Sequence, residues 1–232
     1  MKAANYLGDR SIGVGESPII PPAKGEVRLD VAYCGVCGTD MHIFHGHMDQ
    51  RVPMPMTIGH EVSATVAELG EGVTGVEVGE CVSVRPLLFG EASEFDKGYS
   101  HVGKNLKIIG IDAAGGMQAS WTVPAYTLHS LPEGMSLEQG AMIEPAAVAC
   151  HDVRLGEVKA GETCVVIGGG PIGLLIALVA KEKGASVVLS EVNDSRLELA
   201  RSLGLGVVNP IRDDLVEAVR ELTNGRMADR FE

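Results

Sequence analysis

Thiol, imidazole and carboxylate side chains are concentrated in three short segments of this sequence. The first is Cys34-Gly-Val-Cys37-Gly-Thr-Asp-Met-His42, the second is Gly59-His-Glu61, and the third is Glu144-Pro145. One thiolate, one imidazole and one carboxylate can hold Zn²⁺ tetrahedrally with the fourth position open. A zinc ion with an open position lowers the pKa of a bound alcohol, or polarises a bound carbonyl in the reverse direction. The three segments therefore predict a catalytic zinc site.

The Cys34-x-x-Cys37 pair has two other interpretations, a redox pair or half of a structural zinc knuckle. The sequence contains no second pair with this spacing. Its five cysteines are odd in number and unevenly spaced, which favours metal binding or buried thiols over a disulfide framework. His45 and His47 flank Gly46 in an expected loop, where both a substrate contact and simple surface exposure fit the sequence.

A glycine-rich loop, Gly168-Gly-Gly170-Pro171-Ile172-Gly173, follows a short apolar run and fits the pattern G-x-G-x-x-G. In such a loop Gly168 permits a tight turn, Gly170 lets the backbone approach a pyrophosphate, and Gly173 allows close packing of helix on strand. The helix that begins at Pro171 would present free N–H groups and the positive end of its dipole to the phosphates. The loop therefore predicts a dinucleotide site.

An acidic residue, Glu191, ends the next apolar run, 23 positions after Gly168. This spacing is close to the roughly 20 residues expected for a carboxylate that holds the adenosine ribose hydroxyls. A carboxylate there repels a 2′-phosphate, so NAD is favoured over NADP, although Arg196 five positions later weakens the preference. The alternative is a glycine turn in another kind of α/β domain.

Short strands must position the metal segments, because apolar residues alternate with polar ones before residue 145. Repeated short strands at this spacing predict a small sandwich or barrel. The expected strands are 27–33, 62–69, 76–78 and 81–84, the last two forming a hairpin around a Gly-Glu turn.

After residue 145 the pattern changes to strands that alternate with helices, which predicts a parallel α/β sheet. The boundary lies near residue 150 and gives domains 1–150 and 151–232. A helix is expected to begin at Pro145, and the further elements are helices at 171–183, 195–203 and 213–222 and buried strands at 164–167 and 187–189.

Cys37-Gly-Thr-Asp40, Gly59-His-Glu61, Glu144-Pro145 and the glycine loop occur in an order that resembles the zinc-dependent medium-chain alcohol and polyol dehydrogenases. Glutamate at position 144 is similar to the sorbitol, butanediol and threonine dehydrogenase branch. The resemblance implies α/β plus β architecture, with a GroES-like β-rich catalytic domain followed by a Rossmann doubly wound parallel sheet. It also implies hydride transfer between a secondary alcohol, such as a polyol or sugar-derived alcohol, and NAD.

The resemblance assigns the metal ligands. Cys37 and His60 match the two ligands common to the family. Glu61 and Glu144 both match carboxylate positions that can approach the metal, and the sequence leaves open which of them binds.

The resemblance also assigns residues that act around the metal. Asp40 would accept a hydrogen bond from His60 and fix the tautomer of that ring. Thr39 would hold the substrate hydroxyl and begin a proton relay that passes through the cofactor ribose to His42.

Two features depart from the family pattern. Many relatives bind a second, structural zinc through four cysteines in a lobe, but residues 86–106 contain no cysteine, and Phe95 and Gly103 align with two ligand positions. This predicts one catalytic zinc and a metal-free lobe. From Gly168 onward the chain has room for only one βαβαβ half of a Rossmann domain, so the chain is interpreted as truncated at its C-terminal end, with 228–232 beginning a strand.

Charge and composition exclude several classes of partner. The sequence has 19 Lys and Arg against 31 Asp and Glu, and a net charge of −12 repels phosphate backbones and anionic lipid. No apolar run approaches the roughly 18 residues of a membrane span, and the N-terminus lacks a secretion signal. The sequence predicts a cytoplasmic protein that binds a small alcohol, without a nucleic-acid or membrane partner. The full-length form is expected to be a homodimer or homotetramer.

Two other functions fit parts of the sequence. A truncated chain could bind zinc, nucleotide or both without turnover, because half of the dinucleotide domain is expected to be missing. A zinc-free quinone reductase on the same fold conflicts with the presence of Cys37, His60 and Glu144.

Overall fold

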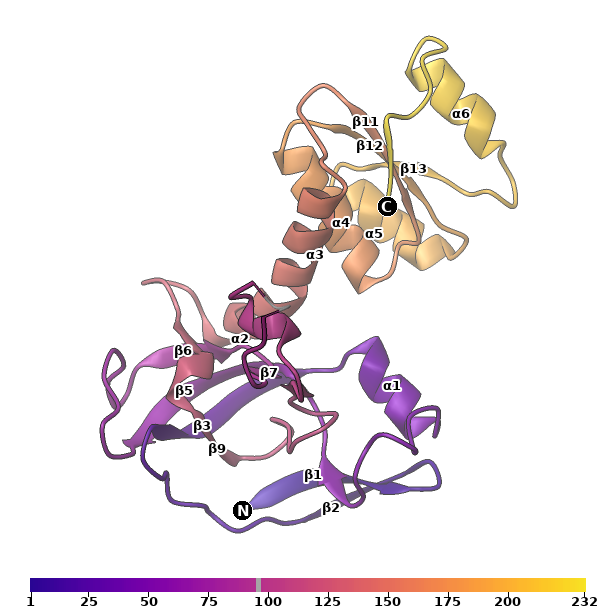
Figure 1. Ribbon diagram of the computed structural model, residues 1–232. Helices are drawn as coiled ribbons and strands as arrows, with labels where there is room; N and C mark the ends of the chain where they lie inside the picture. The colour runs from indigo at the N-terminus through magenta and orange to yellow at the C-terminus, as the bar shows by residue number, and fades with distance from the viewer. Residues whose placement is uncertain (95–96) are drawn as a thin grey trace. The chain divides into compact units, whose positions relative to one another are not determined.

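The chain forms two compact units, Met1–Glu144 and Pro145–Glu232, in a computed structural model that describes residues 1–94 and 97–232 (Figure 1). The division comes before the boundary expected at 150. The reason is helix α3 (Ile143–Leu155), which places Ala149 and Val153 in the core of the second unit. Each unit has hydrophobic cores of its own.

The first unit is built mainly from antiparallel sheets, with strand orders β10-β6-β5-β3-β9 and β2-β1-β4. The strands of the larger sheet are β3 (Glu26–Gly35), β5 (Glu61–Leu69), β6 (Cys81–Val84), β9 (Ser120–Pro124) and β10 (Leu128–Ser130). Those of the smaller sheet are β1 (Lys2–Gly8), β2 (Ser11–Glu16) and β4 (Met56–Thr57). The helical elements are α1 (Gly38–Phe44), η1 (Ser100–Val102), η2 (Ala125–Thr127) and α2 (Leu137–Gly140).

Alternation along β3 and β5 builds the core of the larger sheet. Val27 and Leu29 of β3 are fully buried and belong to one cluster with Val62 and Val66 of β5. A second cluster anchors α1, because the fully buried Ile43 packs with residues of β1 and β4. Both strands therefore form where the sequence predicts them, and α1 is held with one side in the core.

The hairpin expected at 76–78 and 81–84 is wrong in its first arm. Residues 76–78 form no strand, and β6 pairs with β5 and β10 instead. The Gly79 N–H donates to the Val66 carbonyl, and Gly79 has φ +90°, so the turn closes onto β5. The Glu77 N–H donates to the Glu80 carboxylate, which holds the same turn without a second strand.

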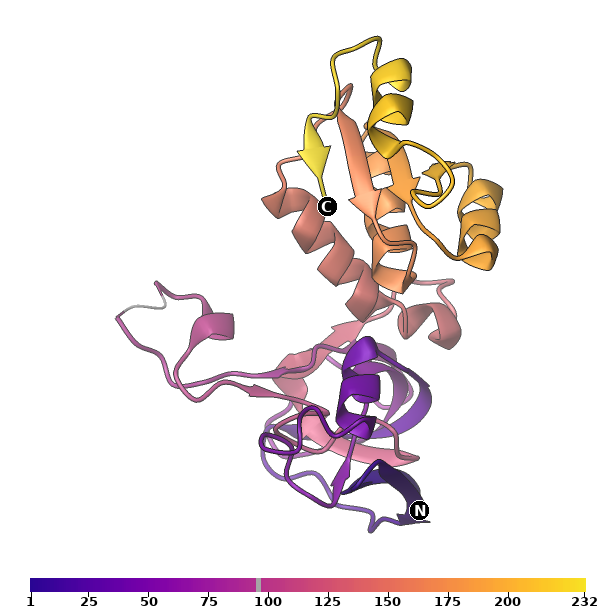
Figure 2. The same cartoon turned by 90° about the vertical axis from the view of Figure 1, so that its right-hand side faces the viewer.

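Residues 86–94 and 97–108 form a lobe that projects from the larger sheet (Figure 2). Its base is the antiparallel pair β7 (Leu87–Leu88) and β8 (Lys107–Ile108), extended by a bridge between Glu91 and Lys104. Gly103 packs close to the Glu91 carbonyl at this bridge, whereas Phe95 lies outside the described residues.

The second unit is a parallel sheet of order β13-β12-β11-β14 with helices on both sides (Figure 2). Val166 of β11 joins a core with Ala177 of α4, whereas Val165 joins another with Val219 of α6, so both sheet faces are covered. The new elements are β11 (Thr163–Ile167), α4 (Pro171–Glu182), β12 (Ser186–Ser190), α5 (Asp194–Ser202), β13 (Gly206–Val208), α6 (Leu215–Leu222) and β14 (Arg230–Phe231).

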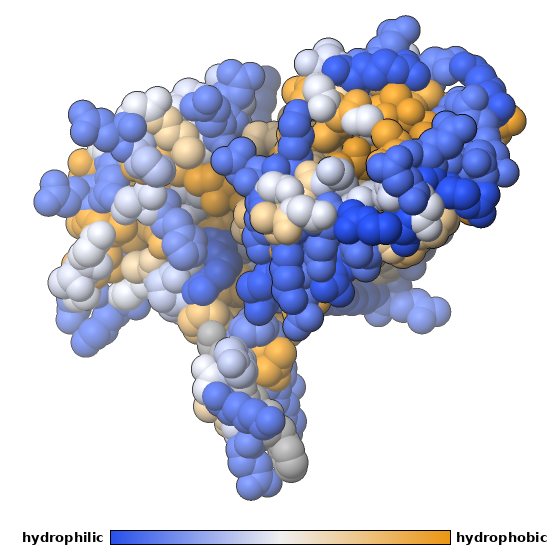
Figure 3. Space-filling model, turned by 90° about the horizontal axis from the view of Figure 1, so that it is seen from above, coloured by the Kyte–Doolittle hydropathy of each residue, from blue (hydrophilic) through white to orange (hydrophobic). Residues whose placement is uncertain are grey.

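The surface of the protein is mixed in polarity. Figure 3 shows a hydrophobic area among strongly hydrophilic ones. Exposed large hydrophobic side chains in the second unit include Ile167, Ile211 and Phe231. Among the described residues, none of the helices combines the length and apolarity that crossing a membrane requires.

Candidate active site

The first metal segment is organised by the start of α1. Cys37 is the residue before the helix, and Asp40 lies in its first turn. The Asp40 carboxylate accepts a hydrogen bond from the Cys37 N–H at 2.8 Å and from the Gly59 N–H at 3.2 Å. Asp40 is 2% exposed, so it joins the Cys37 and Gly59 segments from inside the unit.

The second metal segment turns sharply at Gly59 before β5 begins. Gly59 has φ +94°, which L side chains rarely adopt, and a Cβ there would lie 2.6 Å from both Cys34 Sγ and Met117 Cγ. The turn places His60 and Glu61 at the start of the strand. A glycine is therefore required at this position by conformation and by space.

Cys37, His60 and Glu61 converge, with one possible ligand atom of each within 4.8 Å of the others. His60 is 7% exposed, and its Nδ1 is buried without a hydrogen-bond partner among the described residues. A buried imidazole beside a thiol and a carboxylate is a donor set that suits zinc. These residues thus fit the metal that the sequence predicts.

The hydrogen bond expected from His60 to Asp40 is not formed. His60 Nδ1 and Asp40 Oδ1 are 4.0 Å apart, which is beyond hydrogen-bond distance. The Asp40 oxygens are instead occupied by the backbone N–H groups of Cys37 and Gly59. Asp40 therefore acts on the site through the backbone on both sides and through its charge.

Electrostatics distinguish the two cysteines of the first segment. A hydrogen bond with His60 lowers the pKa of the Cys37 thiol, and the Thr39 backbone and hydroxyl lower it further, against the opposing effect of burial. Burial raises the pKa of Cys34 to about 12, with Asp40 contributing. Of the two thiols, Cys37 is thus the more readily ionised, and Cys34 stays protonated. The difference disfavours a redox pair.

Two carboxylates lie near His60. Burial raises the pKa of Glu61, and the neighbouring His60 partly offsets this. Burial also raises the pKa of Glu144, which His60 again opposes and which the charge of Glu61 reinforces. Burial lowers the pKa of His60, but Cys37, Asp40 and Glu144 outweigh it and raise the pKa above its usual value. A dication at this point would relieve the cost of burying so many acceptors.

The structure places Glu61, but not Glu144, in the group of convergent ligand atoms. The Glu61 side chain folds over Gly35, where a Cβ would collide with its carboxylate. Glu144 stands in the first turn of α3 and is partly buried.

His42 lies near the end of α1 and is exposed to solvent. Its Nδ1 lies 3.2 Å from Nδ1 of His47, a contact that the sequence did not predict. Thr39 is half-buried beside Cys37. The five-residue spacing of the two histidines was visible in the sequence, but only the helix end that the structure shows gives that spacing a meaning.

The glycine loop has the backbone geometry that its sequence predicts. Gly168 has φ +105°, and a Cβ on Gly173 would collide with the Gly168 carbonyl oxygen. A Cβ on Gly170 would meet nothing within 4 Å, so the space in front of this residue is open. Pro171 and Ile172 form the first turn of α4, and Gly170 caps it. This leaves an open cradle at the N-terminus of a twelve-residue helix.

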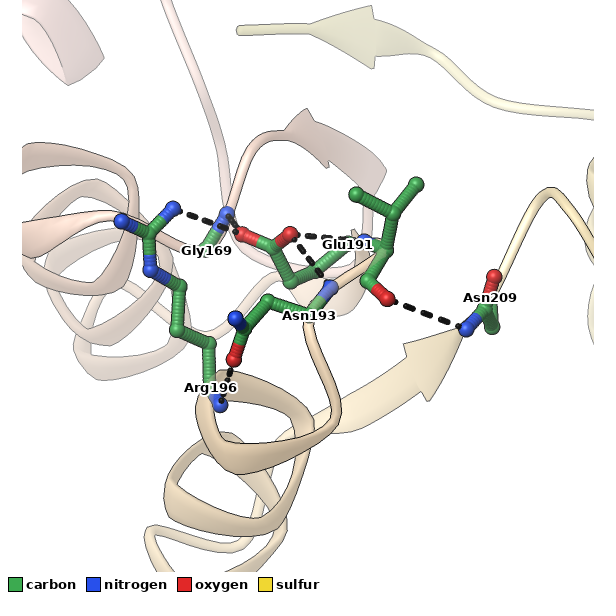
Figure 4. Close-up of polar contacts among 6 residues, drawn as sticks. Gly169, Glu191, Asn193, Arg196 and Asn209 are labelled. Atoms are coloured by element: carbon green, nitrogen blue, oxygen red, sulfur yellow. Dashed lines mark hydrogen bonds and ion pairs between the residues drawn. The ribbon is translucent and has the colours of Figure 1, made fainter.

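Glu191 is bonded to the loop and to its own turn (Figure 4). Its carboxylate accepts from the N–H groups of Gly169 at 2.7 Å, Val192 at 2.6 Å and Asn193 at 2.9 Å. Arg196 Nη1 approaches the same carboxylate at 3.4 Å. The Asn193 bond and the other backbone N–H groups lower the pKa of Glu191, with Arg196 adding to them. These contacts fill the roughly four lone-pair positions of a carboxylate.

Comparison with known proteins gives two family matches. Residues 23–133 match the family described as "Alcohol dehydrogenase GroES-like domain", and residues 171–231 match "Zinc-binding dehydrogenase". These matches cover both units.

Individual proteins give the same result. The chain is 56% identical over 230 residues to 2-dehydro-3-deoxy-L-galactonate 5-dehydrogenase of Pseudoalteromonas atlantica, covering 99% of this chain and 67% of the relative. It is 35% identical to (R,R)-butanediol dehydrogenase of Neisseria gonorrhoeae, covering 99% and 69%. A zinc-binding dehydrogenase from Sinorhizobium meliloti, solved with NADP, matches with a TM-score of 0.88 at 33% identity, covering 94% and 64%. The chain therefore spans about two thirds of the length of these proteins.

Proposed function

This chain belongs to the zinc-dependent medium-chain alcohol and polyol dehydrogenases, and we propose that it carries the zinc site and a dinucleotide loop of an NAD-dependent secondary-alcohol dehydrogenase. The family consists of oxidoreductases that use zinc and a nicotinamide cofactor. The convergence of Cys37, His60 and Glu61 carries the proposal. The reaction is hydride transfer between the alcohol carbon and NAD.

Cys37, His60 and one glutamate would hold the zinc. Glu61 is the proposed third ligand in the arrangement seen here, with Glu144 as the carboxylate able to replace it. When bound, zinc supplies Lewis-acid polarisation of the substrate oxygen. Asp40 holds the Cys37 and Gly59 backbones in place through its two hydrogen bonds. We further propose one zinc per chain, with no metal in the lobe, since Gly103 offers no ligand side chain.

Thr39 and His42 would handle the proton that leaves the alcohol. Thr39 has a hydroxyl beside Cys37, where it can donate to or accept from a substrate hydroxyl. His42 is an exposed imidazole on the same helix and can take up the proton.

The second unit would bind the dinucleotide at the Gly168–Gly173 loop. The open space at Gly170 and the free N–H groups at the start of helix α4 suit a pyrophosphate. The ionised Glu191 disfavours a 2′-phosphate, which supports NAD over NADP. The ribose hydroxyls would replace one of the present donors of Glu191, with Arg196 the most weakly held of them at 3.4 Å.

The substrate we propose is a sugar-derived secondary alcohol. The support comes from the relative that is 56% identical and whose name specifies dehydrogenation at position 5 of a deoxy sugar acid. We further propose that the protein acts in the cytoplasm as a homodimer or homotetramer.

The first experiment is metal content per chain, measured by plasma mass spectrometry on extensively desalted protein. About one zinc that is lost in a Cys37→Ser variant supports the proposal. Two zincs would contradict the metal-free lobe. If the protein contains no zinc and forms no NADH from polyols and sugar acids, the result would favour the alternative, a chain that does not catalyse the reaction.

A further inference from the structure

The turn that ends α1 brings two histidines together. The His47 N–H donates to the His42 carbonyl at 3.0 Å, and the Gly46 N–H donates to the Ile43 carbonyl at 2.9 Å. Gly46 has φ +80°. This pair of bonds around a left-handed glycine is a Schellman motif, which places the side chain after the glycine against the side chain three residues before the helix end. In this protein those two side chains are imidazoles.

The two rings meet through their nitrogen edges. The Nδ1 atoms of His42 and His47 are 3.2 Å apart, whereas the ring centroids are 5.5 Å apart. A hydrogen bond at this distance needs one Nδ1 to carry hydrogen and the other to be bare. The contact therefore fixes complementary tautomers on the two rings, and it leaves Nε2 as the free nitrogen of each.

Other groups of the turn do not replace this contact. His45 lies with its ring centroid 6.0 Å from that of His47, and no hydrogen bond joins them among the described residues. Asp49 accepts a hydrogen bond from the Tyr6 hydroxyl at 2.6 Å, and Arg51 pairs with Asp112. No carboxylate of the described residues is bonded to either imidazole, so His42 depends on His47 for its orientation.

We propose that His47 is a positioning residue for His42 and the outlet of its proton, an inference that rests on the proposed dehydrogenase function. The resting pair has hydrogen on Nδ1 of His42 and on Nε2 of His47. A proton arriving at Nε2 of His42 allows the Nδ1–H bond of His42 to break as a new N–H bond forms at Nδ1 of His47. His47 then gives its Nε2 proton to water, so one proton has crossed both rings and each ring is left in its other tautomer. Proton exchange of the two exposed rings with water restores the resting pair before the next turnover.

The tautomers can be measured without turnover. In ¹⁵N NMR spectra of the whole chain, His42 should be the Nδ1–H tautomer, and His47→Ala should shift it toward Nε2–H. The matched control is His45→Ala, in the same turn, which should leave the His42 tautomer unchanged. An Nε2–H tautomer of His42 in the unaltered protein, or no change in His47→Ala, overturns the proposal.

Steady-state kinetics test whether the proton of His42 leaves through His47. With a sugar-derived alcohol that the protein oxidises, His47→Ala should lower kcat about tenfold with KM unchanged, and added imidazole should restore part of it. In a His42→Gln background the same change should have no further effect. A kcat equal to that of His45→Ala would show that His47 has no role in the relay. If the unaltered chain forms no NADH, the proposed function fails, and the relay with it, whereas the NMR result still reports on the pairing.

Discussion

The Asp40 carboxylate accepts a hydrogen bond from the backbone N–H of Gly59 at 3.2 Å, across 19 positions of sequence. The other carboxylate oxygen binds the Cys37 N–H. Cys37 is itself a proposed zinc ligand, and His60, the residue after Gly59, is another. One buried carboxylate therefore sets the spacing between the two proposed ligands before any metal is bound.

Replacing Asp40 by Asn should weaken zinc binding. Asn retains one acceptor oxygen, so one of the two N–H groups loses its partner, at a cost of about 1–3 kcal/mol in the free energy of unfolding of the first unit. Zinc affinity should fall by about 10- to 100-fold, as for other groups that support metal ligands. Competition with a chromogenic chelator measures the affinity, and urea unfolding measures the stability.

The control for this change is Asp213→Asn, an exposed site in the second unit. Asp213→Asn should alter neither the zinc affinity nor the free energy of unfolding of the first unit. Equal zinc affinity in Asp40→Asn and the unaltered protein would show that the backbone contacts do not support the ligands.

Glu61 and Glu144 should differ in their effect on zinc. Glu61 lies within the convergent group, whereas Glu144 interacts with His60 and Glu61 from the start of α3. Glu61→Gln should therefore reduce zinc affinity by about tenfold or more, and Glu144→Gln should reduce it less. Chelator competition on the two variants checks this order, with Glu68→Gln at the far end of β5 as the control. A larger loss in Glu144→Gln would identify Glu144 as the ligand.

The convergence of Cys37, His60 and Glu61 was predictable from sequence at the level of residue types, because cysteines and histidines are few in the first unit. The role of Asp40 was not, because its partners are backbone N–H groups that any residue could supply. The His60–Asp40 hydrogen bond was wrongly expected for the same reason: the motif gives the residues but not which atom each carboxylate oxygen faces.

The secondary structure was also predictable only in part. Long strands and helices with a buried face, such as β5 and α4, were predictable from periodicity. The segment 76–78 has the same alternation but too few residues, and contacts of Gly79 with β5 determine its conformation. The contact between His42 and His47 depends on a left-handed Gly46, which alternation and hydropathy do not encode.

Alanine at two glycines of the dinucleotide loop should separate packing from binding. A Cβ on Gly173 collides with the Gly168 carbonyl, so Gly173→Ala should destabilise the second unit by about 1–3 kcal/mol. Gly170 has ordinary helix-cap angles and open space, so Gly170→Ala should change stability by less than about 1 kcal/mol, because the reduced freedom of the unfolded chain and the poorer capping by alanine oppose each other. That same methyl group should weaken NAD binding, because it fills the cradle.

Urea unfolding followed by circular dichroism measures the first effect, and calorimetric titration with NAD measures the second. Equal destabilisation by both alanines would mean that Gly170 is packed in solution. Unchanged NAD affinity in Gly170→Ala would place the pyrophosphate elsewhere.

Glu191 and Arg196 should control the choice between NADH and NADPH in opposite directions. Glu191→Gln removes the negative charge that repels a 2′-phosphate, so the ratio of NADPH to NADH affinity should rise. Arg196→Ala removes the cation at 3.4 Å from that carboxylate, so the ratio should fall. Fluorescence titration with each reduced cofactor gives the ratio, and Glu198→Gln on the exposed side of α5 is the control. If the ratio does not change in Glu191→Gln, the charge of Glu191 only binds the N–H groups of the loop and its turn and does not select between the two cofactors.

The ion pair between Asp112 and Arg51 should make the first unit sensitive to acid. Arg51 binds the Asp112 carboxylate through two hydrogen bonds of 2.8 Å, and this contact, with the Ile108 N–H and Lys107, lowers the pKa of Asp112. A lowered folded-state pKa means that the unfolded chain binds the proton more tightly. The pair therefore stabilises the fold fully above the ordinary pKa of an aspartate, and its contribution disappears as pH falls through the lowered value.

Asp112→Asn should cost at most about 1 kcal/mol at pH 7, because Arg51 is half exposed and its charge is screened. The difference in unfolding free energy from the unaltered protein should shrink steadily between pH 5 and pH 2, in the range set by an aspartate pKa of about 3.9 and its lowered folded-state value. Urea unfolding at a series of pH values measures it. The exposed Arg212–Asp194 pair in the second unit provides a comparison. A difference that stays constant with pH would show that the Asp112→Asn change acts through packing and that the charge of Asp112 contributes nothing.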